Sequence, residues 1–307
     1  MKHRSSAPSR TPGLASTIDP DAPFHPRLLM NHLGLSPRRS MGQNFLTSVD
    51  ILKQIVARAG VSTERWVLEV GPGLGALTGY LAATGAQVIA LEKDRGLAEH
   101  LTHFFGQHPN VTIVQTDALE WDPQGLPEGK GQVVANLPYN VAIPILFYLL
   151  QHKERFADLH LMVQKEVAER MAAAPDTDEY GALSVNLQLL ADVETVLEVP
   201  PDAFYPPPKV TSSVVRVTPL TGPRFETGSL KVFERTVKAA FGERRKTLRN
   251  ALKALFPKET VERALVEAAL DGQRRGETLS LSEFCHLSRS LYAAQSVKQS
   301  TESSSQP

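Results

Sequence analysis

Three acidic side chains and one amide occur near the ends of successive apolar runs in this 307-residue chain. They are Glu69 in WVLEV, Glu92 in QVIALE, Asp117 just after VTIVQ, and Asn136 in QVVAN. Carboxylate and amide oxygens accept hydrogen bonds from hydroxyl and amino groups. A carboxylate at Glu92 can accept from both hydroxyls of a ribose, and one at Asp117 can accept from an exocyclic amine. Each acid alone is more often an exposed strand end, but three in register predict a binding site.

The turn after the first apolar run is rich in glycine and reads Glu69-Val-Gly71-Pro-Gly73-Leu-Gly75. Glycine lets the backbone turn sharply and approach a ligand without a Cβ in the way. The spacing is not the G-x-G-x-x-G of dinucleotide folds, no G-K-[ST] follows, and Pro72 lacks a donor that a phosphate cradle would use. The set fits a ligand with an adenosine but no phosphates. S-adenosylmethionine is the common one, and Glu69 would lie near its positively charged sulfonium and amino acid end.

The fourth run ends in the tetrapeptide Asn136-Leu137-Pro138-Tyr139. The amide oxygen of Asn136 and the carbonyl of Leu137 can accept the two hydrogens of an exocyclic amine, and Pro138 fixes the turn. Tyr139 offers a flat face for a base taken out of its stack. Holding both N6 hydrogens of an adenine directs the nitrogen lone pair at a methyl group, so catalysis would rest on orientation and desolvation. A turn with a buried tyrosine is the alternative explanation.

Apolar runs and segments of helical periodicity alternate over the first two thirds of the chain. Strands are expected at 66–70, 87–92, 111–115, 132–136 and 159–164. This rhythm predicts an α/β fold with a Rossmann-like, mainly parallel sheet, helices on both faces and ligands at the carboxyl ends of the strands. Beyond residue 220 only helical patterns remain, at 230–241, 244–255, 259–270 and 280–293.

These patterns divide the chain into four expected segments. They are a disordered tail over 1–36, a cofactor-binding domain over 37–220, an all-helical domain over 221–293 and a second disordered tail over 294–307. A transit peptide is the alternative for the first tail, but its prolines and acids interrupt any amphipathic helix.

The formal net charge of zero hides an uneven distribution. Residues 1–200 hold 16 basic and 22 acidic side chains, whereas residues 201–290 hold 16 and 10. An excess of positive charge in one part of a chain indicates a polyanion-binding surface, with a solvated helical face as the alternative. The candidates for RNA phosphate contacts are Arg244, Arg245, Lys246 and Arg249, with Arg274 and Arg275 as a second cluster and with Arg38 and Arg39 at the entrance to the site.

Other classes of protein are disfavoured by what the sequence lacks. Cys285 is the single cysteine, so no internal disulfide can form, and a cytoplasmic protein is expected. No apolar run reaches the roughly 18–20 residues of a membrane span. We expect no metal site, because nothing near His100 and His103 completes one, and we expect a monomer.

In combination, these motifs closely resemble the ribosomal RNA adenine N6,N6-dimethyltransferases over about residues 35–290. The motifs that carry the resemblance are GQNFL (42–46), LEVGPGLGALT, LEKD, TDAL, NLPYN, VQKEVAERM, YGALSV, VPPDAFYPPPKVTSSVVR and FGERRKTLRN. The resemblance implies that Asn44 and Leu46 join the cofactor site and that Phe204 packs the target base opposite Tyr139. It also implies a substrate: two adjacent adenosines in the 3′-terminal hairpin of small-subunit rRNA, within a partly assembled 30S-type subunit.

Three other classes of protein share some of these features. A large-subunit rRNA methyltransferase of the antibiotic-resistance type shares the fold, but the long helical domain and NLPYN favour the small-subunit branch. An organellar relative that acts as a transcription factor is disfavoured by the intact Glu69, Asn136 and Tyr139. A nicotinamide dehydrogenase is disfavoured by the glycine spacing.

Overall fold

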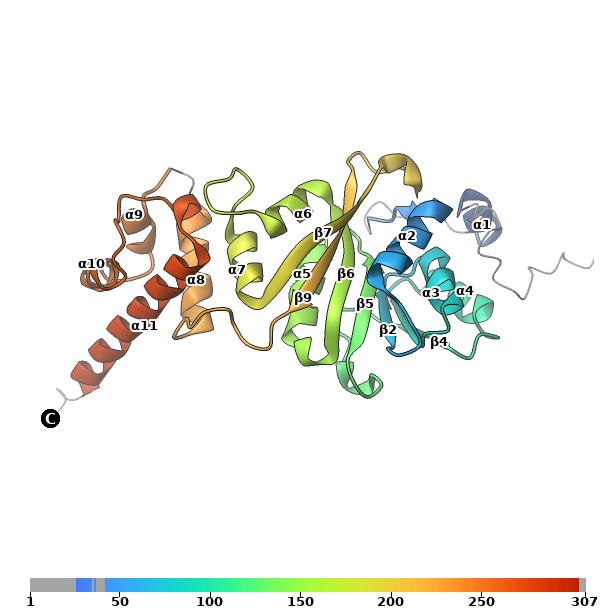
Figure 1. Cartoon of the computed structure of the whole chain (residues 1–307), viewed down its shortest axis with the longest axis horizontal. Coiled ribbons are helices and arrows are strands. Elements are labelled where there is room, and N and C mark those ends of the chain that lie inside the picture. Colours follow the sequence, from blue (N-terminus) through green and yellow to red (C-terminus); the bar gives the residue numbers. More distant parts are fainter. Residues whose placement is uncertain (1–25, 35, 37–41, 244, 304–307) are drawn as a thin grey trace, which may run out of the picture.

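The computed structural model describes residues 26–34, 36, 42–243 and 245–303. Figure 1 shows an elongated molecule in which a helix-flanked sheet occupies one part and the C-terminal helices form the opposite end. Three of the proposed RNA-binding residues, Arg38, Arg39 and Arg244, lie outside the described residues.

A seven-stranded sheet with the order β4-β3-β2-β5-β6-β9-β7 forms the centre of the larger part. The first five strands in that order are parallel to one another, and β9 runs antiparallel to both β6 and β7. The strands are β2 (Val67–Val70), β3 (Val88–Glu92), β4 (Val111–Gln115), β5 (Gly131–Asn136), β6 (Phe156–Gln164), β7 (Ala191–Val199) and β9 (Ser212–Pro219). The five expected strands are confirmed, whereas the antiparallel pair was not predicted.

Helices cover both faces of this sheet, which confirms the expected Rossmann-like α/β class. On one face, α2 (Val49–Ala59) and α3 (Ala76–Ala83) pack on side chains such as Val67 and Val134. On the other face, α5 (Ala142–Gln151), α6 (Lys165–Ala172) and α7 (Ala182–Leu190) pack on side chains such as Leu68 and Val133. Strands buried on both faces need apolar residues at consecutive positions, which is why they read as unbroken apolar runs.

The C-terminal helices share a core with the end of the α/β part. They are α8 (Leu230–Gly242), α9 (Leu248–Leu252), α10 (Lys258–Glu267) and α11 (Leu281–Ser303). Leu187 of α7 belongs to the sheet core, whereas Val185 and Leu189 of the same helix belong to the helical core, which also includes Cys285. The helical core therefore recruits residues from before the expected boundary at residue 220.

Two expectations about disorder are wrong for the described residues. Within the expected tail, α1 (Pro26–His32) is a helix whose Met30 is 2% exposed, because it packs with Phe45, Leu74 and Leu97. At the other end, α11 continues to Ser303, past the expected end at residue 293.

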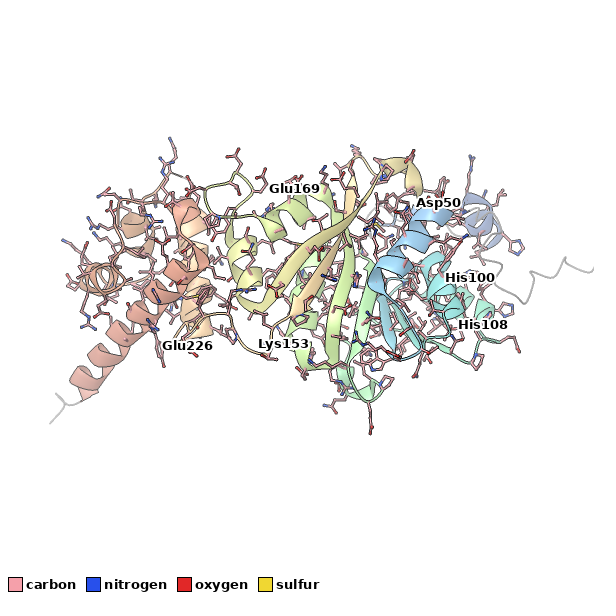
Figure 2. All side chains as sticks on the ribbon, viewed as in Figure 1. Asp50, His100, His108, Lys153, Glu169 and Glu226 are labelled. Carbon is pink, nitrogen blue, oxygen red and sulfur yellow. The ribbon has the colours of Figure 1, made fainter. Side chains whose placement is uncertain are left out.

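None of the helices in the described part of the chain is long and apolar enough to cross a membrane. Among the same residues, no three His, Cys, Asp or Glu side chains group as metal ligands. His100 lies on α4 (Arg95–Phe104), and Figure 2 shows its side chain and that of His108 at the end of the molecule remote from the helical domain.

Candidate active site

A pocket with a volume of about 260 Å³ opens at the carboxyl ends of β2, β3 and β5. It brings together residues that are far apart in the sequence because parallel strands present their carboxyl ends at one edge of the sheet. The predicted residues that line it are Asn44, Leu46, Glu69, Gly71, Gly73, Glu92, Asp117, Asn136, Leu137, Pro138 and Tyr139.

The glycine-rich turn needs its glycines for two reasons. Gly73 and Gly75 have φ angles of 61° and 86°, in the left-handed region that other residues rarely adopt. A Cβ on Gly75 would also lie 2.8 Å from Leu101 and 2.9 Å from Phe105. The N–H of Gly73 donates to Oε2 of Glu92 over 3.0 Å, so the turn is tied to the end of the neighbouring strand.

Glu69 is the most deeply buried charged group of the pocket, with 1% of its surface exposed. Burial raises the pKa of its carboxyl to about 8; the nearby Thr78 hydroxyl lowers that pKa and Glu92 raises it further. Its Oε2 atom has no hydrogen-bond partner among the described residues. A buried, unpaired carboxylate oxygen in the wall of a pocket fits a ligand that brings a positive charge or a donor.

The other two carboxylates already have partners in the chain. Glu92 accepts from the N–H of Gly73 and, at 2.8 Å, from that of Asp94, and each oxygen keeps a second lone pair for a ligand hydroxyl. Asp117 accepts from the Lys93 ammonium at 2.6 Å and from the N–H of Leu119 at 3.0 Å. The Lys93 hydrogen bond lowers the pKa of Asp117, which keeps this carboxylate ionised. Lys93 was not among the predicted site residues, although it stands in the LEKD motif.

Asn136 is oriented by the segment that carries GQNFL. Its Nδ2 donates to the backbone carbonyl of Asn44 over 3.1 Å, and Oδ1 has no hydrogen-bond partner among the residues that the structure describes. The backbone carbonyl of Asn44 can only accept, so the Asn136 atom that faces it must be the donor Nδ2. This contact fixes the orientation of the amide and leaves Oδ1 as a free acceptor. The segment is held in place because β1 (Phe45–Leu46) pairs with β8 (Phe204–Tyr205).

The two aromatic residues of the predicted base-binding site are placed differently. Tyr139 lines the pocket, is partly buried, and its hydroxyl lies 2.6 Å from the Ser212 hydroxyl. Phe204 is 4% exposed, lies opposite Leu46 in β8, and packs in the core beneath α2 and α3. Phe204 is not among the residues that line this pocket, and its position opposite Tyr139 stays a prediction.

The predicted basic residues do not form one helical face. Because α9 begins only at Leu248, Arg245 lies in the preceding turn, where it is exposed. Lys246 pairs with Glu243 at 2.6 Å, and Arg249 with Glu262 at 3.3 Å. The helix expected over 244–255 therefore begins later, and Arg245 and Arg249 do not lie on one helix.

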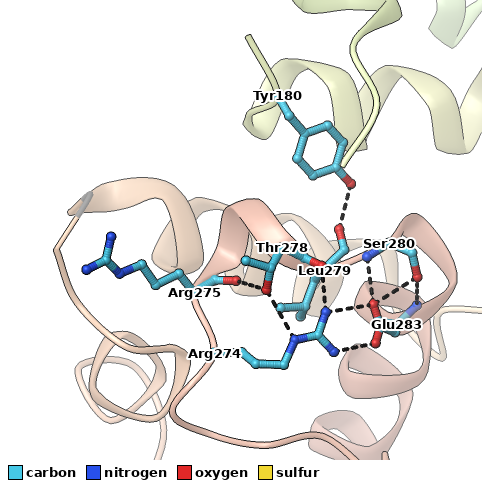
Figure 3. Close-up of polar contacts among 7 residues, drawn as sticks. All are labelled: Tyr180, Arg274, Arg275, Thr278, Leu279, Ser280 and Glu283. Carbon is cyan, nitrogen blue, oxygen red and sulfur yellow. Dashed lines mark hydrogen bonds and ion pairs between the residues drawn. The ribbon is translucent and has the colours of Figure 1, made fainter. Parts of the chain in front are cut away.

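Arg274, part of the second basic cluster, has a structural role. Figure 3 shows its guanidinium between Thr278 and Glu283. It donates to the carbonyl of Thr278 and to a carboxylate oxygen of Glu283, both over 2.5 Å. Glu283 also accepts from the N–H and hydroxyl of Ser280 at the start of α11. Arg274 therefore holds the beginning of α11.

A helix-flanked sheet, with a pocket at the carboxyl ends of its strands and a buried acid that has an unpaired oxygen in the pocket wall, is typical of the class of S-adenosylmethionine-dependent methyltransferases. Within this class, the family model for ribosomal RNA adenine dimethylase matches residues 34–292. The chain belongs to the ribosomal RNA adenine dimethylase family, and it is an enzyme that uses S-adenosylmethionine to methylate adenine in ribosomal RNA.

Individual relatives agree with this assignment. The chain is 45% identical over 270 residues to the ribosomal RNA small subunit methyltransferase A of Geobacter sulfurreducens, with 85% of this chain and 97% of that protein covered. It is 45% identical over 274 residues to the protein of the same name from Moorella thermoacetica, with 86% and 95% covered. Among solved structures, it resembles a dimethyladenosine transferase from Plasmodium falciparum, with a TM-score of 0.67, 26% identity, and coverage of 79% and 95%.

Proposed function

We propose that this protein transfers methyl groups to N6 of two adjacent adenosines in the 3′-terminal hairpin of small-subunit 16S rRNA, giving N6,N6-dimethyladenosine. The pocket supports this function most directly through Asn136, whose oriented amide leaves an acceptor beside the wall that carries Glu69. The small subunit is favoured because relatives that match over most of their length carry small-subunit methyltransferase names.

Each pocket residue has a role in this proposal. When bound, S-adenosylmethionine supplies the electrophilic methyl group. Glu69 holds the positive end of the cofactor, Glu92 accepts from the ribose hydroxyls, and Asp117 accepts from the adenine amine. The remaining contacts to the cofactor come from Asn44, Leu46, Gly71, Gly73 and Asn136.

The N-L-P-Y loop acts on the target base. Oδ1 of Asn136 and the carbonyl of Leu137 accept the two N6 hydrogens, and Pro138 keeps these acceptors on one side of the turn. The ring of Tyr139 supports the flipped adenine. Forming the N6–methyl bond would break the methyl–sulfur bond of the cofactor and leave a neutral thioether, which is a good leaving group. The chain therefore needs to orient the nitrogen and exclude water from the reacting atoms rather than supply a strong base, and the proton that the methylated nitrogen loses would pass to solvent. After the first transfer only one N6 hydrogen remains, so one of the two acceptors is sufficient in the second.

The helical domain is the proposed contact with the rest of the RNA. Arg245 is exposed, and with Arg244, Lys246 and Arg249 it would contact phosphates and position the hairpin. Arg38 and Arg39, which precede GQNFL, would contact phosphates at the entrance to the site. We propose that the natural substrate is a partly assembled 30S-type subunit and that the protein acts as a monomer in the cytoplasm. The excess of positive charge in residues 201–290 supports a ribonucleoprotein partner.

A large-subunit rRNA is the second candidate substrate. It rests on the likeness to the solved 23S rRNA methyltransferase ErmE, with a TM-score of 0.61, 28% identity, and coverage of 81% of this chain and 99% of that one. The proteins named for the small subunit are more similar in sequence, which favours the first candidate.

Transfer of labelled methyl from S-adenosylmethionine to small subunits that lack the modification tests the proposal, with mass spectrometry of the digested rRNA. The wild-type protein should give dimethyladenosine at two adjacent positions of the 3′-terminal hairpin. Asn136→Ala should reduce transfer by at least about 100-fold, since both the orientation of the nitrogen and one acceptor are lost. Label in large-subunit RNA alone would favour the second candidate, and label in neither would exclude both.

A further inference from the structure

The N-L-P-Y loop is joined to strand β9 by a hydrogen bond between two hydroxyl groups. The hydroxyl oxygens of Tyr139 and Ser212 lie 2.6 Å apart, although the residues are 73 positions apart in the sequence. Ser212 is the first residue of β9 and has no exposed surface. The bond therefore connects the tip of a pocket-lining aromatic side chain to the interior of the sheet.

Ser212 is held firmly by its neighbours on both sides. In the sheet it lies opposite Gln164 at the end of β6 and opposite Val199 at the end of β7. The carbonyl of the preceding Thr211 accepts from the N–H of Lys165 over 3.0 Å. With its backbone paired in this way, the Ser212 hydroxyl is a fixed point, whereas Tyr139 lies in a loop.

A buried hydroxyl without a partner is unfavourable, so the two groups stabilise each other. A tyrosine side chain can rotate about its two χ torsions, and a contact at the hydroxyl removes most of that freedom because it holds the far end of the ring. The ring face is the part on which a flipped base would stack. The hydrogen bond that holds the Tyr139 hydroxyl therefore also determines the position of the ring face.

We infer that Ser212 is a positioning residue for the methyl transfer, because its hydroxyl holds the ring of Tyr139 at the pocket in the orientation that receives the target base. This inference rests on the proposed role of the N-L-P-Y loop and extends it to a residue of β9. Ser212 itself needs no contact with the cofactor or with the base.

A double-mutant cycle tests the inference, with Ser212→Ala, Tyr139→Phe and the double variant assayed on small subunits. Each single variant removes the same bond and keeps the ring, so kcat should fall about tenfold in both, the effect of one hydrogen bond. The double variant should be no slower than either single variant. The Kd for S-adenosylmethionine should stay unchanged, and Ser212→Thr, which keeps a hydroxyl, should restore most of the rate.

Ser213→Ala is the matched control. Ser213 is 1% exposed and adjacent in β9, but neighbouring side chains of a strand point to opposite faces, so it cannot replace Ser212. Its kcat should stay within about twofold of wild type. Additive losses in the double variant, or an equal loss in Ser213→Ala, would overturn the inference in favour of a general effect on the packing of β9.

A measurement without RNA separates this inference from the proposed function. The chain has 6 tyrosines, and the NMR signal of Tyr139 labelled with 13C at Cζ can be assigned by its loss in Tyr139→Phe. Burial raises the pKa of the Tyr139 hydroxyl, and the Ser212 hydrogen bond opposes this rise. Ser212→Ala should therefore shift that signal and raise the Tyr139 pKa further. An unchanged signal would show that the Tyr139–Ser212 hydrogen bond does not form in solution. If instead the wild-type protein is inactive on small subunits, only the proposed substrate is refuted.

Discussion

Glu69 differs from Glu92 and Asp117 in how fully its carboxyl oxygens are hydrogen-bonded. Glu92 and Asp117 are each satisfied by N–H groups or by Lys93, so they tolerate an empty site. Glu69 is buried with an unpaired oxygen, and its charged form is therefore disfavoured until a cation arrives. Binding of a positively charged cofactor should for this reason be coupled to loss of a proton from Glu69.

The coupling predicts a pH dependence of cofactor affinity. Below a pKa of about 8, the carboxyl is protonated in the free enzyme and must release its proton on binding. The Kd should therefore fall by up to about tenfold per pH unit as the pH rises from 6 to 8, and level off above 8. Calorimetry in buffers of different ionisation enthalpy should detect the proton released at pH 7. Glu69→Gln should bind more weakly and without this dependence.

Glu69 should also make the stability of the free enzyme depend on pH. A rise in pH, which strengthens cofactor binding, should lower this stability. Its folded-state pKa lies above the ordinary 4.5, so its contribution to stability is complete below pH 4.5 and is lost as the pH rises through 8. Stability relative to Glu69→Gln should change by about 1.4 kcal/mol per pH unit between these values. The Tm of Glu69→Gln minus that of the wild type should therefore be greater at pH 8 than at pH 5. An equal difference in Tm at both pH values would contradict the raised pKa.

Among the elements, α1 and the β1–β8 ribbon complete a pocket that the sheet alone would leave open. The ribbon carries Asn44 and Leu46 to the pocket. Helix α1 lies before the residues matched by the family model, yet its Met30 packs on Phe45, Leu74 and Leu97, and all three line the pocket. Helix α1 therefore supports the pocket wall from behind.

Met30→Asp should loosen α1 and weaken cofactor binding by about tenfold, or about 1.4 kcal/mol, since a charge cannot remain among these apolar side chains. Leu28→Asp on the same helix is the control, because Leu28 is 65% exposed and should tolerate the charge. Isothermal titration with S-adenosylmethionine measures both. If Met30→Asp binds like the wild type, α1 has no part in supporting the pocket.

At the scale of the whole molecule, the helical domain and the sheet are joined through α7 and the segment before it. The hydroxyl of Tyr180 donates to the carbonyl of Leu279 over 2.9 Å, and Figure 3 draws this hydrogen bond between the two parts. Two arginines of this domain differ in their environment. Arg274 is used within the fold, whereas Arg245 is exposed and forms no ion pair with any described residue.

These environments predict opposite effects for two arginines. Arg274→Ala should lower the unfolding free energy by about 2 kcal/mol, because hydrogen bonds to charged groups are lost. Arg245→Ala should leave the Tm unchanged, weaken binding to small-subunit rRNA, and reduce the slope of log K against log salt by about 1. Thermal unfolding and filter binding over a range of salt concentrations measure these effects. A salt slope that is unchanged in Arg245→Ala would remove this residue from the RNA contacts.

The sequence by itself determined the parallel part of the sheet and most of the pocket. A strand buried on both faces requires an unbroken apolar run, and such runs end visibly at Glu92 and Asn136. Once the strands are parallel, their carboxyl ends must meet, so residues that follow them share a site. The family was also evident from motifs in order, which included GQNFL and NLPYN.

Only the tertiary structure decided which polar groups satisfy one another. No local pattern shows that Ser212 forms a hydrogen bond with Tyr139, that Lys93 pairs with Asp117, or that Arg274 holds the start of α11. The burial of Phe204 and the docking of Met30 likewise depend on segments distant in sequence. Residue type and spacing indicate which interactions a side chain can make. Which partner it has depends on the packing of the whole chain, because a buried polar or apolar group is stable only in surroundings of matching polarity.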